Sequence, residues 1–278
     1  MGEQAGLGPL DDVLQTAVGI AQQAAELIRH RARGEVHFKG AVDLVTDVDT
    51  AAEALIAARL HAAFPAARLV KEEGGVEAGD AAATWYVDPI DGTTNFAHGF
   101  PQFAVSLGLE LAGELAVGVV ADVGRREVYA AARGLGAWLL DDAGGRQRLT
   151  VSATTELSRA LLATGFPYDR HTAVDCNLAE FEAFLRRAQG IRRAGSAALD
   201  LAFTARGWLD GYWEMKLQPW DLAGGVLLVR EAGGLVTGYD GGPFALGARQ
   251  VVASCNPRLH DQLLAVLQQV RGGQGPRD

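Results

Sequence analysis

Two carboxylates, Asp88 and Asp91, stand three residues apart at the end of an apolar run that begins at Trp85. Pro89 stiffens the chain between them. Gly-Thr-Thr-Asn at 92–95 follows, and these small residues suit a tight bend that begins a helix. Such a bend points backbone N–H groups at an anion, and the helix dipole favours negative charge there. Oxygen ligands for a cation therefore lie beside a cradle for phosphate, which indicates metal-dependent phosphate chemistry.

Each carboxylate also has an ordinary structural interpretation. Asp-Pro and Asp-Gly are common turn dipeptides, and an aspartate at a strand end is usually a cap. Turn chemistry therefore explains Asp88 or Asp91 better than function does when each is taken singly. The combined run Asp-Pro-Ile-Asp-Gly-Thr-Thr-Asn is far more specific than either part.

Asp88-Pro-Ile-Asp-Gly-Thr-Thr-Asn-Phe96 resembles the first signature of the inositol monophosphatase family of Mg²⁺-dependent, lithium-sensitive phosphatases. Trp220-Asp221-Leu-Ala-Gly-Gly225, with Glu231-Ala-Gly-Gly234 after it, resembles the second. The similarity extends from about Leu10 to about Leu267. It implies an α+β / α/β fold, the layered αβαβα sandwich of the inositol monophosphatase and fructose-1,6-bisphosphatase type.

The resemblance implies two or three Mg²⁺ ions as cofactors. Mg²⁺ prefers oxygen ligands in near-octahedral geometry and keeps several waters, so one or two carboxylates per ion suffice. The positions that match the family's ligands are Glu72, Asp88, the carbonyl of Ile90, Asp91 and Asp221, with Asp88 shared between ions. A helix N-cap is the ordinary interpretation of Asp221.

Lys71 departs from the family pattern, which usually has glycine before the first glutamate. Two adjacent glutamates in a loop are usually solvated, so the role of Glu72 depends on the resemblance. We expect Lys71 either to lower the local metal affinity or to pair with Glu73.

The implied reaction is in-line attack of water on a phosphomonoester, without a phosphoenzyme. Glu72 and Asp88 would hold an ion that lowers the pKa of the water. Thr93 and Asp49 would orient the water and take its proton. Asp47 lies close by in the sequence and remains an alternative to Asp49, and helix capping would also explain either one.

The implied substrate-binding residues are Gly92, Thr93, Thr94, Ser196, Ala197 and Glu214. The backbone N–H groups of Gly92 and Thr93 would hold the phosphate. Glu214 matches the position that hydrogen-bonds a substrate hydroxyl, although a carboxylate at a strand end is usually exposed. His98 is interpreted as a loop residue.

The metal and phosphate groups do not select the alcohol. Trp-Glu-Met at 213–215 and Gly-Ser-Ala-Ala at 195–198 are most similar to bacterial inositol-1-phosphate phosphatases. Histidinol-phosphate phosphatases of the same family are close, and their cationic substrate would pair with Glu214. A third hypothesis, from another class, is a binding or regulatory protein with vestigial catalysis. The resemblance also implies a homodimer.

The net charge is −9, and no Lys/Arg cluster exceeds a pair. We therefore expect a small phosphorylated substrate and no nucleic-acid partner. Cys176 and Cys255 form no disulfide framework or CxxC motif. No basic region followed by an apolar core marks a signal peptide, and residues 92–109 contain too many polar side chains for a membrane span. We expect a cytoplasmic protein without a membrane partner.

The hydrophobic periodicity predicts one domain over 1–278, with an α+β half at about 1–145 and an α/β half at about 146–270. In the first half we expect two helices on an antiparallel sheet. The helices are predicted at 10–33 and 50–63, with strands at 36–39, 68–73, 103–110, 114–122, 127–132 and 136–140. In the second half we expect a mixed sheet with helices on its faces. Its helices are predicted at 173–188, from 195, at 221–232 and from 257, with strands at 160–164, 190–193 and 209–215 and two short strands before the last helix.

Overall fold

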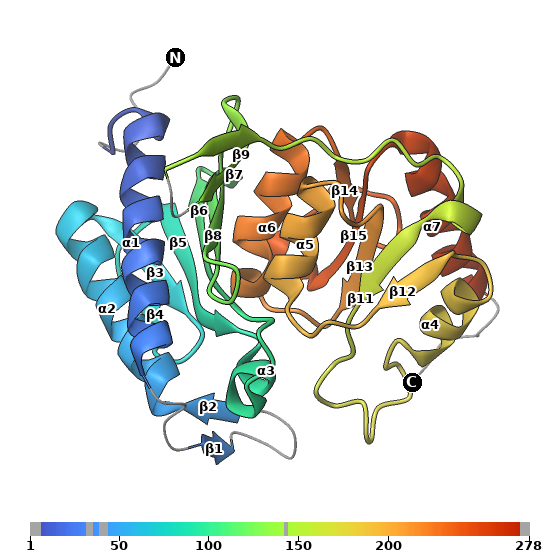
Figure 1. Ribbon diagram of the computed structural model, residues 1–278, viewed down its shortest axis with the longest axis horizontal. Helices are drawn as coiled ribbons and strands as arrows, with labels where there is room; N and C mark the ends of the chain where they lie inside the picture. The colour runs from blue at the N-terminus through green and yellow to red at the C-terminus, as the bar shows by residue number, and fades with distance from the viewer. Residues whose placement is uncertain (1–6, 32–35, 39–43, 142–143, 273–278) are drawn as a thin grey trace.

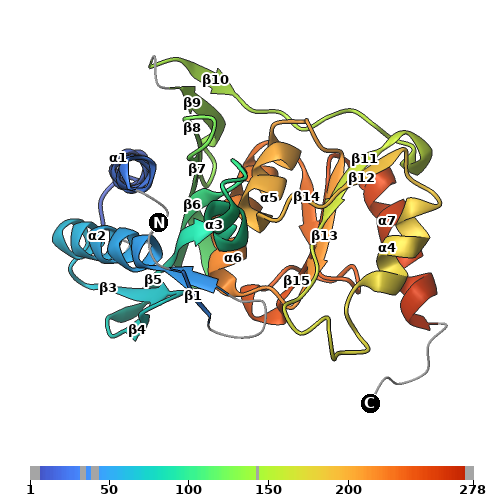
Figure 2. The same cartoon turned by 60° about the horizontal axis from the view of Figure 1, so that its bottom comes forward.

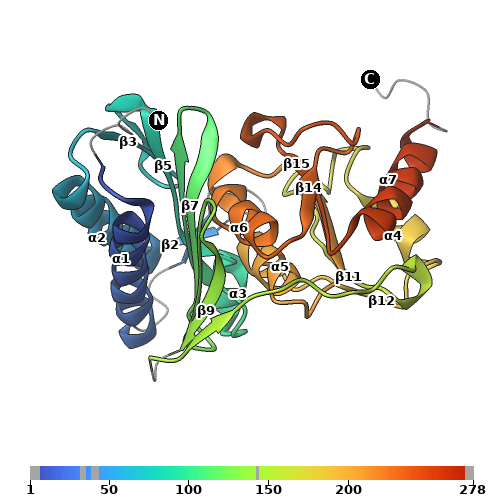
Figure 3. The same ribbon diagram turned by 90° about the horizontal axis from the view of Figure 1, so that it is seen from above.

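The computed structural model describes residues 7–31, 36–38, 44–141 and 144–272. Helices and sheets alternate in αβαβα layers, which confirms the predicted fold class (Figure 1). The first helix layer is α1 (Leu10–His30) with α2 (Asp47–Ala63), the middle one is α5 (Ala197–Ala205) with α6 (Pro219–Glu231), and the last is α4 (Leu178–Leu185) with α7 (Pro257–Gly272). Seen from above, the middle pair lies between the two sheets (Figure 3).

The larger sheet has eight strands in the order β10-β9-β8-β7-β6-β5-β3-β4. The bounds are β3 Ala67–Lys71, β4 Gly75–Glu77, β5 Asp80–Asp91, β6 Ala104–Leu111, β7 Glu114–Asp122, β8 Glu127–Ala132, β9 Gly136–Asp141 and β10 Arg146–Arg148. The prediction of an antiparallel sheet is wrong for one pair, because β3 and β5 run parallel. The β3–β4 hairpin reverses the chain, so that β5 enters on the other side of β3 in the same direction.

The smaller sheet has five strands in the order β12-β11-β13-β15-β14. The bounds are β11 Leu161–Thr164, β12 Gly190–Arg192, β13 Gly211–Met215, β14 Leu235–Thr237 and β15 Gln250–Ser254. Because β11 is parallel to β12 and β13 while β15 is antiparallel to β13 and β14, the predicted mixed sheet is confirmed. The remaining elements are β1 Val36–Phe38, β2 Leu44–Thr46, α3 Thr93–His98 and the 3₁₀ turns Leu157–Arg159 and Leu246–Ala248.

Helix boundaries differ from the predictions where a local contact overrides periodicity. α1 ends at His30 rather than at Arg33, since Arg31 is already extended. α2 begins at Asp47, because the side chain of Thr46 accepts hydrogen bonds from the backbone of Val48 and Asp49 and so caps the helix. Asp49 is therefore inside the first turn and not at the helix start.

The predicted helix at 173–188 is shorter in the structure and begins at Leu178. Asn177 precedes it with a left-handed backbone conformation (φ +69°). The buried amide of Asn177 donates to the hydroxyl of Thr164 and to the carbonyl of Gly165, so the segment before α4 is held as a loop against the end of β11. Among the residues that the structure describes, no helix is long and apolar enough to cross a membrane.

Close packing of α6 on the larger sheet depends on glycine. Gly108 of β6 and Gly118 of β7 are register partners under α6. A Cβ atom on Gly108 would lie 2.3 Å from the Cβ of Ala223, and one on Gly118 would lie 2.4 Å from the carbonyl oxygen of Gly224. On the other side, a Cβ on Gly225 would lie 2.6 Å from the Cβ of Leu201 in α5. The backbone of α6 therefore lies directly on the sheet, which brings its first turn to the end of β5.

Candidate active site

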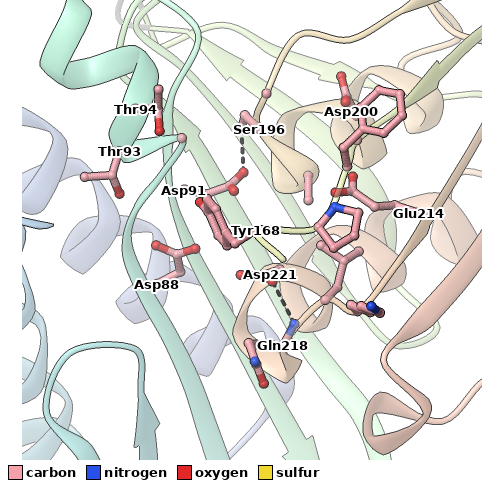
Figure 4. Close-up of a pocket in the computed structure, with 18 of the residues that line it drawn as sticks. Asp88, Asp91, Thr93, Thr94, Tyr168, Ser196, Asp200, Glu214, Gln218 and Asp221 are labelled. Atoms are coloured by element: carbon pink, nitrogen blue, oxygen red, sulfur yellow. Dashed lines mark hydrogen bonds between the residues drawn. The ribbon is translucent and has the colours of Figure 1, made fainter. Parts of the chain in front are cut away.

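A bulge near the end of β5 places Asp88 and Asp91 together. Asp88 pairs with Ser106 of β6 and Asp91 with Ala104, so β5 has one more residue than β6 over this interval. In a regular strand, residues three apart face opposite sides, and the extra residue removes that alternation. Pro89 has no N–H to donate to the ladder, which suits the interruption. Asp88 and Asp91 consequently point into one pocket (Figure 4).

Asp221 approaches the same point from the first turn of α6. Its Oδ2 accepts a hydrogen bond of 2.7 Å from the backbone N–H of Gln218, which caps the helix, so the predicted N-cap role of Asp221 belongs to Gln218. The carbonyl of Trp220 accepts a bond from the hydroxyl of Ser106, which fastens this turn to β6. One oxygen each from Asp88, Asp91 and Asp221 lies within 4.8 Å of the others.

The middle layer also holds Asp91. Its Oδ2 accepts hydrogen bonds from the hydroxyl of Ser196 and, at 2.7 Å, from the backbone N–H of Ala198. Ser196 is also the N-cap of α5, since its hydroxyl accepts from the N–H of Leu199. Ser196 therefore positions a carboxylate, and the predicted substrate contacts of Ser196 and Ala197 remain predictions.

The electrostatics of the three aspartates favour a bound cation. Burial, followed by the charges of Glu72, Asp91 and Asp221, raises the pKa of Asp88 well above its usual range. Burial also raises the pKa of Asp221, and it raises that of Asp91 to about 6. The Oδ1 atom of Asp88 is buried and has no hydrogen-bond partner among the residues that the structure describes. An all-oxygen donor set with an unsatisfied carboxylate oxygen fits a hard divalent cation such as Mg²⁺.

Glu72 follows β3 and lines the same pocket. Its backbone N–H donates to the carbonyl of Val87 at 3.1 Å, which places it beside Asp88. The charge of Glu72 contributes to the raised pKa values of Asp88 and Asp221. The structure thus brings Glu72 to the three aspartates, and its role as a ligand remains a prediction.

The geometry distinguishes Asp49 from Asp47. The hydroxyl of Thr93 lies 3.2 Å from Oδ1 of Asp49 and 3.0 Å from the carbonyl oxygen of Ile90. Asp49 has no exposed surface, and its other oxygen accepts from the backbone N–H of Thr46. Asp47 is exposed at the first position of α2. Only Asp49 of the two is placed to act on the pocket, and it reaches it through Thr93.

The bend after β5 is built as predicted. Gly92 has φ +97°, a conformation that glycine adopts without strain, and α3 begins at the next residue. A Cβ on Gly92 would lie 2.9 Å from the carbonyl oxygen of Gln102. The amide of Asn95 donates to the carbonyls of Gln102 and Ala194, which ties this turn to the segment before α5 (Figure 2). Gly92, Thr93 and Thr94 line the pocket.

The pocket has a volume of about 890 Å³, and its far wall comes from the smaller sheet. Glu214 of β13 lies there, and its Oε2 accepts a hydrogen bond of 2.6 Å from the hydroxyl of Tyr212. Burial raises the pKa of Glu214 to about 7, against the opposing effects of Tyr212 and Arg193. A Cβ on Gly165 would lie 2.1 Å from Oε1 of Glu214, so a larger residue there would displace the Glu214 carboxylate.

Several pocket residues were not predicted from the sequence. Asp200, in α5, is 2% exposed, and burial and the charges of Glu214 and Asp91 raise its pKa. It stands on the same wall as Glu214 (Figure 4). The sequence does contain a feature that could have identified Asp200, because it is the one charged residue in the helix Ala-Ala-Leu-Asp-Leu-Ala-Phe-Thr-Ala. His98 ends α3 rather than lying in a loop, and it lines the pocket with Tyr168 and Arg193.

Comparisons with known proteins agree with this geometry. The sequence profile of the inositol monophosphatase family matches residues 9–271. An inositol-1-monophosphatase of Synechocystis sp. is 43% identical over 84% of this chain and 80% of its own. The Nus factor SuhB of Pseudomonas aeruginosa is 42% identical over 93% of this chain and 97% of its own. The solved structure of the inositol monophosphatase from Anabaena (Nostoc) sp. PCC 7120 superposes with a TM-score of 0.84, at 40% identity, and the match covers 94% of this chain and 96% of that one. This chain therefore belongs to the inositol monophosphatase family.

Proposed function

We propose that the protein is a Mg²⁺-dependent phosphomonoesterase that hydrolyses inositol 1-phosphate or a similar small polyol phosphate. The observation that carries the proposal is the convergence of Asp88, Asp91 and Asp221 within 4.8 Å, beside the turn at Gly92. Three buried carboxylates with raised pKa values are costly unless cations neutralise them. The substrate phosphate carries charge of the same sign, so it also requires those cations.

Two or three Mg²⁺ ions would be held by Glu72, Asp88, the carbonyl of Ile90, Asp91 and Asp221. When bound, they supply Lewis-acid stabilisation of the phosphate and lower the pKa of a water molecule. Asp49 and Thr93 orient the attacking water and take its proton, since the hydroxyl of Thr93 lies between Asp49 and the pocket.

The phosphate is held by backbone N–H groups of Gly92 and Thr93 and lies beside Thr94. The first N–H groups of a helix have no partner within the helix, so those at the start of α3 are free to bind an anion. The substrate alcohol lies against Ser196, Ala197 and Glu214, and its hydroxyl groups donate to the carboxylate of Glu214. We add Asp200 to this alcohol subsite because it is a second carboxylate on the same wall.

Histidinol phosphate is the alternative substrate of the same reaction. Two neighbouring carboxylates, Glu214 and Asp200, would pair with the amine and imidazole of that substrate. Arg193 opposes this, because its positive charge already acts on both carboxylates. That charge partly offsets the rise that burial causes in their pKa values. An uncharged polyol therefore suits the wall better.

A second function, from a different class, is favoured by one comparison. A relative that is 42% identical is named a Nus factor, so we propose that this chain, like that protein, has a regulatory role in addition to or in place of catalysis. The complete set of carboxylates favours catalysis as the first hypothesis.

Three further properties belong to the proposal: inhibition by lithium, a homodimer and a cytoplasmic location. Membership of the family supports the first two, and light scattering of the purified protein tests the dimer. We also propose one domain whose halves meet at the pocket, because Asp91 of the larger sheet bonds to α5.

The test is phosphate release with Mg²⁺ from myo-inositol 1-phosphate and histidinol phosphate side by side, with and without lithium. We expect faster phosphate release from myo-inositol 1-phosphate than from histidinol phosphate. Lithium and the Asp91→Asn substitution should each abolish that release. Preference for histidinol phosphate would select the alternative substrate. No release from either substrate by the folded protein would reject the enzymatic proposal and leave the regulatory one.

A further inference from the structure

We propose that Lys71 and Glu53 are positioning residues, which hold the loop that carries Glu72 in place for metal binding. The inference rests on the proposed function, because it assumes that Glu72 is a metal ligand. Lys71 is the residue that departs from the family pattern. A positive charge beside a cation site is expected to weaken metal binding, whereas the proposed role of Lys71 strengthens it.

Lys71 and Glu72 face opposite sides of the larger sheet. Lys71 is the register partner of Val87 in the parallel pair of β3 and β5, and Val87 belongs to the core under α1 and α2. The next positions are Glu72 and Asp88, which line the pocket on the other face. The ammonium group of Lys71 is therefore directed to α2, away from the aspartates, because side chains alternate across a sheet.

Glu53 of α2 connects Lys71 to the loop that carries Glu72. Its Oε1 lies 3.7 Å from Nζ of Lys71, and its Oε2 accepts a hydrogen bond of 2.7 Å from the backbone N–H of Glu73. The side chains of Lys71 and Glu53 are only 9% and 6% exposed. A buried carboxylate without a counter-charge is strongly disfavoured, and the ammonium group of Lys71 supplies that charge beside Glu53, which holds the loop.

The loop fits closely over this ion pair. A Cβ atom on Gly74 would lie 2.6 Å from Nζ of Lys71 and 2.7 Å from Oε1 of Glu53. On its other side, Lys71 pairs with Glu77 of β4, which also contacts His61 of α2. Among the described residues, the ion pairs of Lys71 are those with Glu53 and Glu77, and its link to Glu73 runs through Glu53.

Glu72 is consequently held by its own backbone and by that of the next residue. Its own N–H donates to Val87, and the N–H of the next residue donates to Glu53. Residues behind a metal ligand typically change metal affinity by about 10- to 100-fold when they are removed. Two effects of Lys71 then oppose each other, because its charge repels a cation while its contact with Glu53 holds a ligand.

The test is Mg²⁺ titration of the metal-free protein by calorimetry, comparing the wild type with Lys71→Met. Positioning predicts that Lys71→Met weakens Mg²⁺ binding roughly tenfold. Charge repulsion alone predicts tighter binding. Lys71→Arg, which keeps the charge and the donors, is expected to restore most of the affinity. Unchanged or tighter binding by Lys71→Met would overturn the proposal.

Lys216→Met is the matched control for loss of a positive charge. Lys216 also forms an ion pair, with Asp169, but unlike Lys71 it lines the pocket, on the wall opposite Glu72. We expect Mg²⁺ binding by this variant to be unchanged or slightly tighter. Weakening equal to that of Lys71→Met would show that the effect is not specific to the loop, and would overturn the proposal.

Hydrogen exchange supplies a readout that does not require the Lys71 variant to fold. In the metal-free wild type we expect the amide of Glu73, which donates to Glu53, to be protected from exchange, and Glu53→Ala to remove that protection. An unprotected Glu73 amide in the wild type would contradict the proposal. If the wild type binds no Mg²⁺ at all, the proposed function fails. If it binds Mg²⁺ and Lys71→Met binds equally well, only the positioning role fails.

Discussion

Asp91 accepts a hydrogen bond of 2.7 Å from the backbone N–H of Ala198, which fastens the end of β5 to the first turn of α5. One carboxylate therefore joins the larger sheet to the middle helix layer at the centre of the candidate site. The site is assembled by packing between layers. Substitutions can test the chemistry of its carboxylates separately from that packing.

Replacing Asp91 or Asp221 by asparagine should lower the rate of Mg²⁺-dependent phosphate release by more than about a hundredfold. Loss of a residue that only supports a metal ligand lowers activity by up to about that factor, so loss of the ligand itself should lower it more. Asparagine keeps the size and one acceptor oxygen, so the fold should survive. Phosphate release and circular dichroism are measured on the same samples. Near-normal release by both folded variants would contradict the metal site.

The apparent affinity for Mg²⁺ should rise with pH. The pKa of Asp91 is raised to about 6, and those of Asp88 and Asp221 are raised as well, so a cation displaces protons at acidic pH. We expect affinity to strengthen by up to about tenfold per pH unit for each proton displaced. Calorimetry at pH 5.5, 6.5 and 7.5 in two buffers of different ionisation enthalpy measures both quantities. Affinity independent of pH would show that the ion binds elsewhere.

The stability of the metal-free protein should carry a signature of Glu214. Its folded pKa of about 7 lies above the ordinary value of 4.5, so its contribution is fully present below about pH 4.5 and is lost as the pH rises through 7. Relative to the wild type, Glu214→Gln should gain up to about 3 kcal/mol between these limits. Urea unfolding at pH 5 and pH 8 measures the difference.

Glu182→Gln is the control for that experiment, because the Glu182 side chain is 65% exposed on α4. We expect its stability to follow the wild type at both pH values. Parallel profiles for Glu214→Gln and the wild type would contradict the raised pKa.

Asp200→Asn should separate the alcohol subsite from the metal site. If Asp200 accepts a hydrogen bond from the substrate alcohol, the variant should lose roughly tenfold in kcat/KM for inositol 1-phosphate, the value of about one hydrogen bond to a charged group. Mg²⁺ affinity should stay near that of the wild type, and stability should not fall, since a buried charge is removed. An unchanged kcat/KM would assign Asp200 no contact with the substrate.

Gly224→Ala should displace α6 and with it Asp221. The added Cβ would lie 2.9 Å from the carbonyl oxygen of Leu107 and 3.0 Å from the hydroxyl of Ser106. We expect a loss of about 1–3 kcal/mol in unfolding free energy and weaker Mg²⁺ binding. Gly19→Ala in α1 is the control, because nothing lies within 4 Å of its added Cβ, and it should be neutral or stabilising by up to about 1 kcal/mol. Equal stability of the two variants would contradict the close approach of α6.

Residue types and local patterns in the sequence were enough to predict the chemistry of the site and the layered fold. Asp88-Pro-Ile-Asp-Gly92 is a local motif in which proline and glycine act on their own neighbours, so its turn could be predicted from residue types alone. Alternation of strands and helices likewise follows from local hydrophobic periodicity. The αβαβα arrangement came from the family resemblance, and the structure confirms it.

Which side chains meet depends on tertiary packing. Periodicity does not report that Asp49 contacts Thr93, that Asn177 holds the loop before α4, or that Lys71 pairs with Glu53, because each contact joins segments distant in sequence. Asp200 enters the pocket because glycine lets α5 and α6 pack closely. These outcomes depend on the register of β5 and the approach of α6 to the sheet, and both are set by packing across the whole chain.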